Sequence, residues 1–298
     1  MRVLVTGAGG LIGSEVVGQL LDRSHEVIAL DRPGPMARLS RWHGKMTTRV
    51  ADLDDDAATR AALTEARPDA IIHMAWYADP RDYLTSPGNL ASLATTTRFV
   101  EAALGGGCRK LVIAGSCVEY APRDRPLVEN DPAVPATLYG ACKHAAWIVS
   151  RTLAAAAGAE LSWARIFHLH GPHEDPARLI PWVARELRAG RAVDLTDGTQ
   201  VRDHLHVVDV ASGLVTLLGP GASGIYNVSS GQPVTLRRVL ETVGEIVGGA
   251  ALLRFGARPH RPGETMFLAG DPGRLRALGW SPRFGLDEGL RDALRGGN

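Results

Sequence analysis

The feature that most constrains how this chain can fold is a glycine-rich turn close to its amino end. A short run rich in Val and Leu, from Arg2 to Thr6, leads into the turn, and apolar residues recur with helical spacing from Ile12 to Leu21. Three glycines accompany these segments: Gly7, Gly10 and Gly13. The pattern predicts a strand, a tight turn and a helix, whose first amides, at Leu11, Ile12 and Gly13, can bind an anion. It indicates a dinucleotide site or, in the plainer alternative, an ordinary strand-to-helix connection.

An acidic residue follows where a dinucleotide site needs one. The apolar run from Glu26 to Leu30 predicts a second strand, and Asp31 comes directly after it, 18 residues beyond Gly13. A carboxylate there can accept hydrogen bonds from both hydroxyls of the adenosine ribose. Because the same charge repels the 2′-phosphate of NADP, Asp31 favours NAD, although the neighbouring Arg32 could soften the preference.

Composition limits the classes of partner. The chain has 298 residues, 45% of them hydrophobic, and a formal net charge of +1, so we expect a globular protein without a nucleic-acid groove or a membrane-binding surface. No segment approaches the roughly 18 uncharged apolar residues of a membrane span. The three cysteines, Cys108, Cys117 and Cys142, form no close pair, which fits a reducing cytoplasm. The expected partner is a small molecule.

Strand and helix patterns alternate through the first half of the chain. A third strand ends at Asp52 and Leu53, where the carboxylate either accepts a bond from the adenine amine or caps the next helix. The fourth strand, 70–75, is apolar on both faces, as in a parallel sheet covered by helices on each side. Its tip places Ala75 beside the cofactor and leads into Trp76, at the edge where doubly wound sheets bind ligands.

Three polar side chains further along suggest proton transfer. A fifth strand, 110–114, leads to Ser116, and Tyr139 and Lys143 stand four residues apart at the start of an Ala-rich helical stretch. On a helix that spacing places both on one face, where an ammonium beside a phenol lowers the pKa of the tyrosine toward the range of a general acid or base. Ser116 can hold the substrate oxygen to which Tyr139 delivers a proton. Taken singly, each of the three also suits a helix surface or a cap.

Together these residues resemble the extended short-chain dehydrogenase/reductase family, specifically its nucleotide-sugar epimerases, dehydratases and ketoreductases. The family's Thr-Gly-x-x-Gly-x-x-Gly signature matches Thr6 to Gly13, and its ribose acid matches Asp31. Its catalytic trio matches Ser116, Tyr139 and Lys143. The resemblance covers nearly the whole chain and implies that NAD is the cofactor and that Lys143 also binds the nicotinamide ribose.

Downstream motifs of the same family imply the substrate. The segment from Arg202 to Asp209 is similar to its Arg-Asp-x-x-His-Val-x-Asp motif, and Arg261 begins a segment similar to its Arg-x-Gly-Asp turn. In relatives, arginines at positions like Arg202 and Arg261 bind the diphosphate of a nucleotide sugar, because a planar guanidinium meets phosphate oxygens in two places. Arg178, which precedes a Leu-Ile-Pro segment, is a third candidate, and Trp76 is placed at the substrate.

The chain also departs from the family pattern. His168 stands where relatives often carry an asparagine that touches the substrate, so the substrate is left open. Cys117 and Val118 replace the Asp-Glu pair of the dehydratases, and Glu119 comes one residue later, where strand alternation would aim it elsewhere. A 4,6-dehydratase is therefore not expected.

Histidines gather in two segments of the second half. They are His168, His170, His173, His204 and His206. Their spacing matches no tetrahedral zinc template and no cysteine lies among them, so no metal is expected.

The expected fold class is α/β, a Rossmann-type doubly wound parallel sheet with a smaller C-terminal α/β substrate-binding domain. Residues 1–163, with a return segment at about 204–230, should form the NAD-binding domain. Residues 164–203 and 231–298 should form the nucleotide-sugar-binding domain. The resemblance implies a homodimer that pairs through helices near 90–104 and 139–157.

Three functions remain open at this point. The first is epimerisation at C4 of a nucleotide sugar through a transient 4-keto sugar, with NAD retained. The second is reduction of an existing 4-keto group in a nucleotide-linked deoxysugar, with NADH or NADPH consumed. The third is a dinucleotide-binding protein without catalysis, against which the intact Ser116, Tyr139 and Lys143 argue. The first is preferred, and the sequence leaves the base and the sugar undetermined.

Overall fold

A seven-stranded sheet forms the centre of the protein. The computed structural model describes residues 1–32 and 36–295. The strands follow the order β10-β6-β5-β4-β1-β2-β3, and every neighbouring pair is parallel. They are β1 (Arg2–Thr6), β2 (Glu26–Asp31), β3 (Thr47–Val50), β4 (Ala70–His73), β5 (Lys110–Ser116), β6 (Glu160–Ile166) and β10 (Gly224–Val228). The direction in which the chain adds strands reverses between β1 and β4, and such a switch point is where doubly wound sheets bind ligands.

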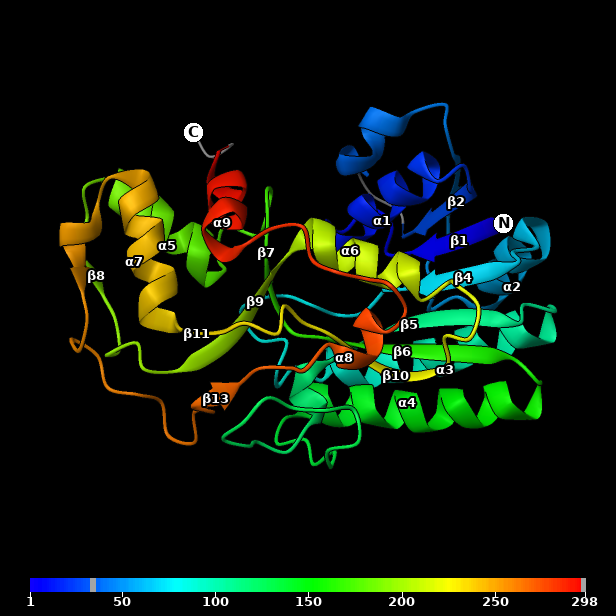
Figure 1. The fold of residues 1–298 in the computed structure, drawn as a ribbon. Coiled ribbons are helices and arrows are strands. Elements are labelled where there is room, and N and C mark those ends of the chain that lie inside the picture. Colours follow the sequence, from blue (N-terminus) through cyan, green and yellow to red (C-terminus); the bar gives the residue numbers. More distant parts are fainter. Residues whose placement is uncertain (33–35, 296–298) are drawn as a thin grey trace.

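Helices cover both faces of this sheet (Figure 1). Side chains alternate along a strand, so Val3 and Val5 of β1 join one apolar core while Leu4 joins the other. The first core is closed by α1 (Leu11–Asp22) and α6 (Val207–Thr216). The second is closed by α2 (Asp56–Ala66), α3 (Gly88–Gly105) and α4 (Leu138–Ala156). The predicted Rossmann-type, doubly wound fold is confirmed.

A smaller group of strands and helices lies beside one end of the sheet, on the left of Figure 1. Its strands are β7 (His168–His170), β8 (Val193–Asp194), β9 (Val201–His206), β11 (Pro233–Thr235), β12 (Leu253–Arg254) and β13 (Phe267–Leu268). Its helices are α5 (Leu179–Arg188), α7 (Leu236–Val247) and α9 (Leu286–Leu294), and the short α8 (Gly273–Arg276) returns to β10. A third apolar core, with Val183, Val239 and Leu290, joins α5, α7 and α9.

The strands β7 and β9 link the smaller group to the large sheet. They pair in parallel, and Leu169 and Leu205 pack on the core under α1 and α6. The alternate side chains point the other way and form what we call the histidine ladder: His168 beside His204, and His170 beside His206. The helix α9 covers the ladder so closely that a Cβ on Gly289 would lie 2.6 Å from Nε2 of His170.

Short helical turns and loops complete the described chain. Short 3₁₀ helices occur at η1 (Ala37–Trp42), η2 (Cys117–Glu119) and η3 (Ala250–Leu252). The three cysteines are buried free thiols. None of the described helices is both long enough and apolar enough to cross a bilayer.

Candidate active site

The glycine turn brings the start of α1 against the end of β4. Gly7 has a φ of +65°, and a Cβ on it would lie 3.0 Å from the Ala75 nitrogen. A Cβ on Gly13 would lie 2.1 Å from the carbonyl oxygen of Gly7, so only glycine fits there. The N-cap of α1 is Gly10, which has no side chain to bond the helix amides. The first amides of α1, at Leu11, Ile12 and Gly13, therefore remain available to an anion.

Asp31 is held beside this turn at the end of β2. Its Oδ2 accepts the amide of Gly9 at 2.8 Å and its Oδ1 accepts the amide of Arg32 at 2.9 Å. A carboxylate has about four acceptor positions, so further hydrogen bonds can be accepted. Asp31 is half-buried and Arg32 is exposed. The structure thus places the acidic side chain next to the glycine turn, as the sequence predicted.

Asp52 follows β3 and is exposed, whereas Leu53 is buried. One of the two roles considered for Asp52, capping the next helix, is wrong. The N-cap of α2 is Asp55, whose carboxylate accepts the amides of Ala57 and Ala58, while the Asp52 carboxylate accepts the amide of Asp54. The turn after β3 is longer than the sequence pattern suggested, which moves the cap three residues along. Contact of Asp52 with an adenine stays a prediction.

Ser116 and Tyr139 meet at the carboxyl end of β5. Ser116 ends the strand and begins η2, and Tyr139 lies in the first turn of α4, where its amide donates to the carbonyl of Leu84 at 3.1 Å. Thr137 caps this helix through the amide of Gly140. Burial raises the pKa of the Tyr139 phenol above its usual value, and a hydrogen bond with Ser116 offsets part of that shift.

Lys143 lies one helical turn beyond Tyr139, but its ammonium group binds a backbone carbonyl and not the phenol. Its Nζ donates to the carbonyl of Ala114 at 2.8 Å and lies 3.8 Å from the centre of the Trp76 ring, against 5.9 Å from the Tyr139 ring. Burial lowers the pKa of Lys143 to about 7. The predicted fall in the pKa of Tyr139 is therefore wrong for this arrangement, because burial of the phenol outweighs an ammonium that bonds elsewhere.

Aromatic side chains surround Tyr139. Trp76 meets it edge-on with ring centres 6.3 Å apart, and Tyr83 does the same at 5.2 Å. Trp76 is fixed by a hydrogen bond from its indole to Asn89 at 2.9 Å. Sequence reasoning singled out Trp76 and missed Tyr83, which lies in an irregular loop whose path no periodic pattern predicts. The guanidinium of Arg178 lies 4.9 Å from the Tyr83 ring centre, which brings this arginine to the same wall.

Two of the three predicted anion-binding arginines, Arg178 and Arg202, lie near His168. Arg202 donates to the carbonyls of Val201 and Thr265, so its guanidinium is anchored. Burial, together with the positive charges of Arg202 and Arg178, lowers the pKa of His168 to about 4. These three side chains therefore lie near one another. Arg261 is exposed on a turn next to Glu264, to which its amide donates at 3.3 Å.

Glu119 lies in the interior of the protein, three residues after Ser116 in the chain. It is fully buried beneath β5, where it contacts Trp163 and Arg165. The expectation that Glu119 points elsewhere holds, although the reason differs: the residue lies on the η2 turn and not on a strand.

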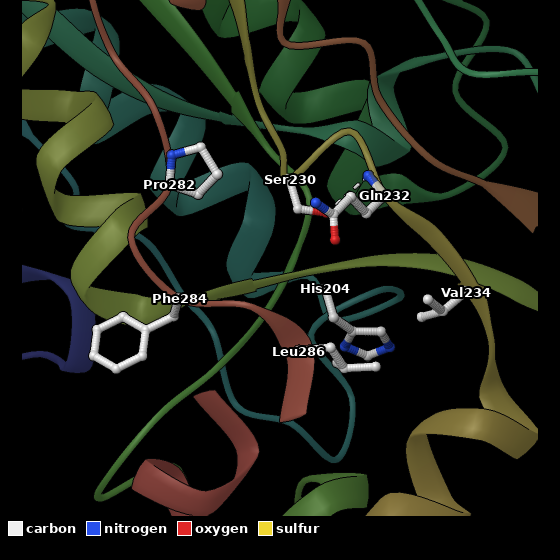
Figure 2. A pocket seen from close by; sticks show the side chains of 7 residues that line it. All are labelled: His204, Ser230, Gln232, Val234, Pro282, Phe284 and Leu286. Carbon is white, nitrogen blue, oxygen red and sulfur yellow. Dashed lines mark hydrogen bonds between the residues drawn. The ribbon is translucent and has the colours of Figure 1, made fainter. Parts of the chain in front are cut away.

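The histidine ladder forms no recognisable metal site. Burial is the largest of the effects that lower the pKa of each of its four imidazoles. Within 1–32 and 36–295, no group of three or more His, Cys, Asp or Glu side chains is arranged to hold a metal ion. A cavity of about 20 Å³ opens beside His204, and Figure 2 shows Phe284 and Leu286 among the side chains around it.

Comparison with known proteins decides the family. The model of the NAD dependent epimerase/dehydratase family matches residues 3–229. The chain belongs to this family. A UDP-glucose 4-epimerase of Mycolicibacterium smegmatis is 31% identical over 97% of this chain and 96% of the relative. This member of the family is therefore an NAD-dependent enzyme of the extended short-chain dehydrogenase/reductase type, as the sequence predicted.

Solved structures agree in fold and cofactor. The crystal structure of Thermus thermophilus UDP-glucose 4-epimerase with NAD superposes with a TM-score of 0.89 at 30% identity and covers 100% of both chains. The protein MoeE5, solved with UDP-glucuronic acid and NAD, gives 0.86 at 29% identity and covers 99% of this chain and 98% of its own. The uncapped start of α1 suits the pyrophosphate of NAD, and the Asp31 carboxylate suits the diol of its adenosine ribose.

Proposed function

We propose that this family member interconverts nucleotide sugars that differ in configuration at C4. The observation that carries the proposal is the meeting of Ser116, Tyr139 and Lys143 at the end of β5, beside the switch point that holds the glycine turn. The similar proteins of Mycolicibacterium smegmatis and Thermus thermophilus are named UDP-glucose 4-epimerases, which supports the same reaction here.

When bound, NAD would supply a reversible hydride acceptor for C4 of the sugar, and return of the hydride to the opposite face of the keto sugar would give the epimer. Tyr139 removes the proton of the C4 hydroxyl and later gives it back, while the Ser116 hydroxyl bonds the same sugar oxygen. For the phenol to act near neutral pH, the Lys143 ammonium must leave the Ala114 carbonyl and approach Tyr139, since a nearby positive charge lowers the pKa of a phenol. In that position it also binds the nicotinamide ribose.

The substrate handle in this proposal is a diphosphate. Arg202 is anchored by two backbone carbonyls, and Arg178 and His168 lie near it, so positive charge and imidazole donors converge on one place. Arg261 would close over the same group from its exposed turn. Trp76 would pack against the sugar, beside Tyr139.

The proposal assigns the chain two domains, one for each ligand. Residues 1–163 with about 204–230 would hold NAD, and 164–203 with 231–298 would hold the nucleotide sugar.

A homodimer would form through α3 and α4, which expose Leu90, Ile148 and Val149. Light scattering of wild type and an Ile148→Asp variant tests the pairing. The cytoplasm, where thiols stay reduced, suits the three free cysteines.

The deciding experiment has two steps. The purified protein is denatured and the released nucleotide is identified, and the native protein is then incubated with UDP-, TDP-, GDP- and CDP-linked hexoses without added cofactor. The C4 epimer of one sugar should appear, detected by NMR, with about one NAD released per chain. Turnover that needs added NADH or NADPH and a 4-keto sugar would instead identify a ketoreductase.

Replacement of Tyr139 by phenylalanine tests the proton transfer. Tyr139→Phe should slow turnover by roughly 10²–10⁴-fold, because the general acid/base is lost, while NAD binding followed by calorimetry persists. A variant that kept more than about a tenth of the wild-type rate, under conditions where chemistry limits, would contradict the assigned role.

A further inference from the structure

A buried ion pair lies directly beneath the turn that presents Ser116. Glu119 is fully buried, and its Oε2 accepts from Nε of Arg165 at 3.0 Å. Arg165 is itself only 1% exposed and stacks on the Tyr120 ring, with 4.1 Å from the guanidinium carbon to the ring centre. Burying two charges is costly unless they are paired and hydrogen-bonded, so a chain that keeps this pair needs a reason for it.

The carboxylate of Glu119 reaches back to the backbone of Ser116. Its Oε1 accepts the Ser116 amide at 2.7 Å, while the Ser116 hydroxyl caps the same turn through Val118. The two bonds form a capping box around η2. They fix the backbone of Ser116, and with it the direction in which the hydroxyl leaves the end of β5.

Neighbouring groups on β5 and β6 enclose the Glu119 carboxylate. The indole of Trp163 donates to Glu119 from β6, at 2.9 Å to Oε1. A Cβ on Gly115 would lie 2.2 Å from that indole nitrogen and 2.7 Å from Oε1, so the glycine before Ser116 makes the space that the carboxylate fills. Nδ1 of His144, the residue after Lys143, lies 3.9 Å from Oε2 of Glu119.

The Tyr120 side chain extends the network to β10. Its hydroxyl donates to Asn227 at 2.7 Å, and the amide of Asn227 donates to Glu129 at 2.9 Å. The arginine is thus held between a carboxylate and an aromatic ring that is itself anchored to β10. An ion pair fixed at both ends can hold the Ser116 turn to a fraction of an ångström, which is the precision that a catalytic group needs.

We propose that Glu119, held by Arg165 and Trp163, is a positioning residue that aims the Ser116 hydroxyl at the substrate oxygen. The inference rests on the proposed function, because Ser116 is the group through which Glu119 acts. It assigns a role to a carboxylate that is fully buried.

The test is a double-mutant cycle between Glu119→Gln and Ser116→Ala. Glutamine keeps the size of the side chain but turns an amide N–H₂ toward the donors of Arg165 and Trp163. Glu119→Gln should lower kcat by about 10–100-fold and change KM by less than about twofold. In the Ser116→Ala background the same change should have almost no further effect, because its target is already gone. Equal losses in both backgrounds, or no loss in the first, would overturn the inference.

Two further variants guard against a general folding defect. Trp163→Phe removes one donor to Glu119 and should give a smaller loss of kcat that Ser116→Ala also masks. Asp131→Asn is the matched control: Asp131 likewise accepts a backbone amide three residues earlier, from Val128, and pairs with Arg125, but it lies outside the site and should leave kcat unchanged.

A crystal structure of Glu119→Gln separates this inference from the proposed function. If wild type epimerises no nucleotide sugar, the function fails, yet a displaced Ser116 turn in the variant would still support the positioning role. A Ser116 backbone and hydroxyl that stay in place would overturn the role, whatever reaction the wild type performs.

Discussion

Glu119 with Arg165 forms one group of buried polar side chains and the histidine ladder forms another, and burial affects the two groups in opposite ways. In the first, opposite charges contact one another, and each has a further partner in Ser116, Trp163 or Tyr120. In the ladder, both ring nitrogens of His170 and of His204 have no hydrogen-bond partner within the described chain.

The difference shows two solutions to the cost of removing polar groups from water. A pair of opposite charges remains charged because each offsets the burial of the other. In the described chain, His170 and His204 pack against other imidazoles, whose charge would have the same sign, and they stay neutral instead. His206 differs, because its Nε2 lies 3.2 Å from Oδ2 of Asp292. Burial lowers the pKa of His170 and of His204 to about 3, and neighbouring histidines add to both shifts. Removing one charge of the Glu119–Arg165 pair should therefore lower the free energy of unfolding, and acid should lower it through the histidine ladder.

Separating the charged pair should give the largest effect on stability. Arg165→Met leaves the Glu119 carboxylate buried without its counter-charge, and we expect a loss of about 3–5 kcal/mol in the free energy of unfolding, measured with urea at pH 7.5. The double variant Glu119→Leu, Arg165→Met should recover much of that loss. Arg125→Met, which removes the exposed partner of Asp131, is the control and should stay near wild type. A small loss in Arg165→Met would show that the two clusters do not differ as described.

Removal of Arg202 tests the point where the ladder meets the proposed diphosphate site. Loss of one bidentate contact should weaken binding of the preferred nucleoside diphosphate by about 1.5–3 kcal/mol, measured by calorimetry on protein saturated with NAD. Arg202→Lys should recover only part, because an ammonium cannot reproduce the fork. Unchanged binding in Arg202→Ala, or no binding of UDP, TDP, GDP or CDP to wild type, would count against the diphosphate assignment.

Acid should lower the free energy of unfolding through His170, one member of the ladder. The pKa of His170 is about 3 in the folded protein, below the usual 6.5, so the unfolded chain takes up the proton first as the pH falls. The contribution of the neutral His170 ring to the free energy of unfolding is therefore complete above about pH 6.5. It is lost progressively as the pH falls below that value. At pH 5.5 this amounts to about 1.4 kcal/mol, which the non-titrating His170→Gln should not lose.

The measurement is urea unfolding of wild type and His170→Gln at pH 7.5 and 5.5. The difference between the two proteins should shift in favour of the variant by that amount at the lower pH. The exposed His43→Gln should show no such shift. An identical difference at both pH values for His170→Gln would mean that the ladder is already open to protons in the folded protein.

The sequence alone determined the parts of this protein that depend on short-range geometry. Gly7, Gly13 and Asp31 were predictable because a tight turn, a helix start and the next strand tip are set within some thirty residues. Tyr139 and Lys143 were predictable as neighbours because helical spacing places residues four apart on one face. Apolar runs on both faces predicted a parallel sheet between two helical layers.

Tertiary structure decided what depends on residues far apart in the chain. Glu119 and Arg165 are 46 positions apart, and only the pairing of β5 with β6 brings them together. The ladder needs the register that sets His168 beside His204. The direction in which the pKa of Tyr139 moves was also beyond the sequence, because it follows from how deeply the phenol is buried and from which oxygen Lys143 bonds. Periodicity fixes which face a residue occupies, but burial and partners are set only when distant faces meet.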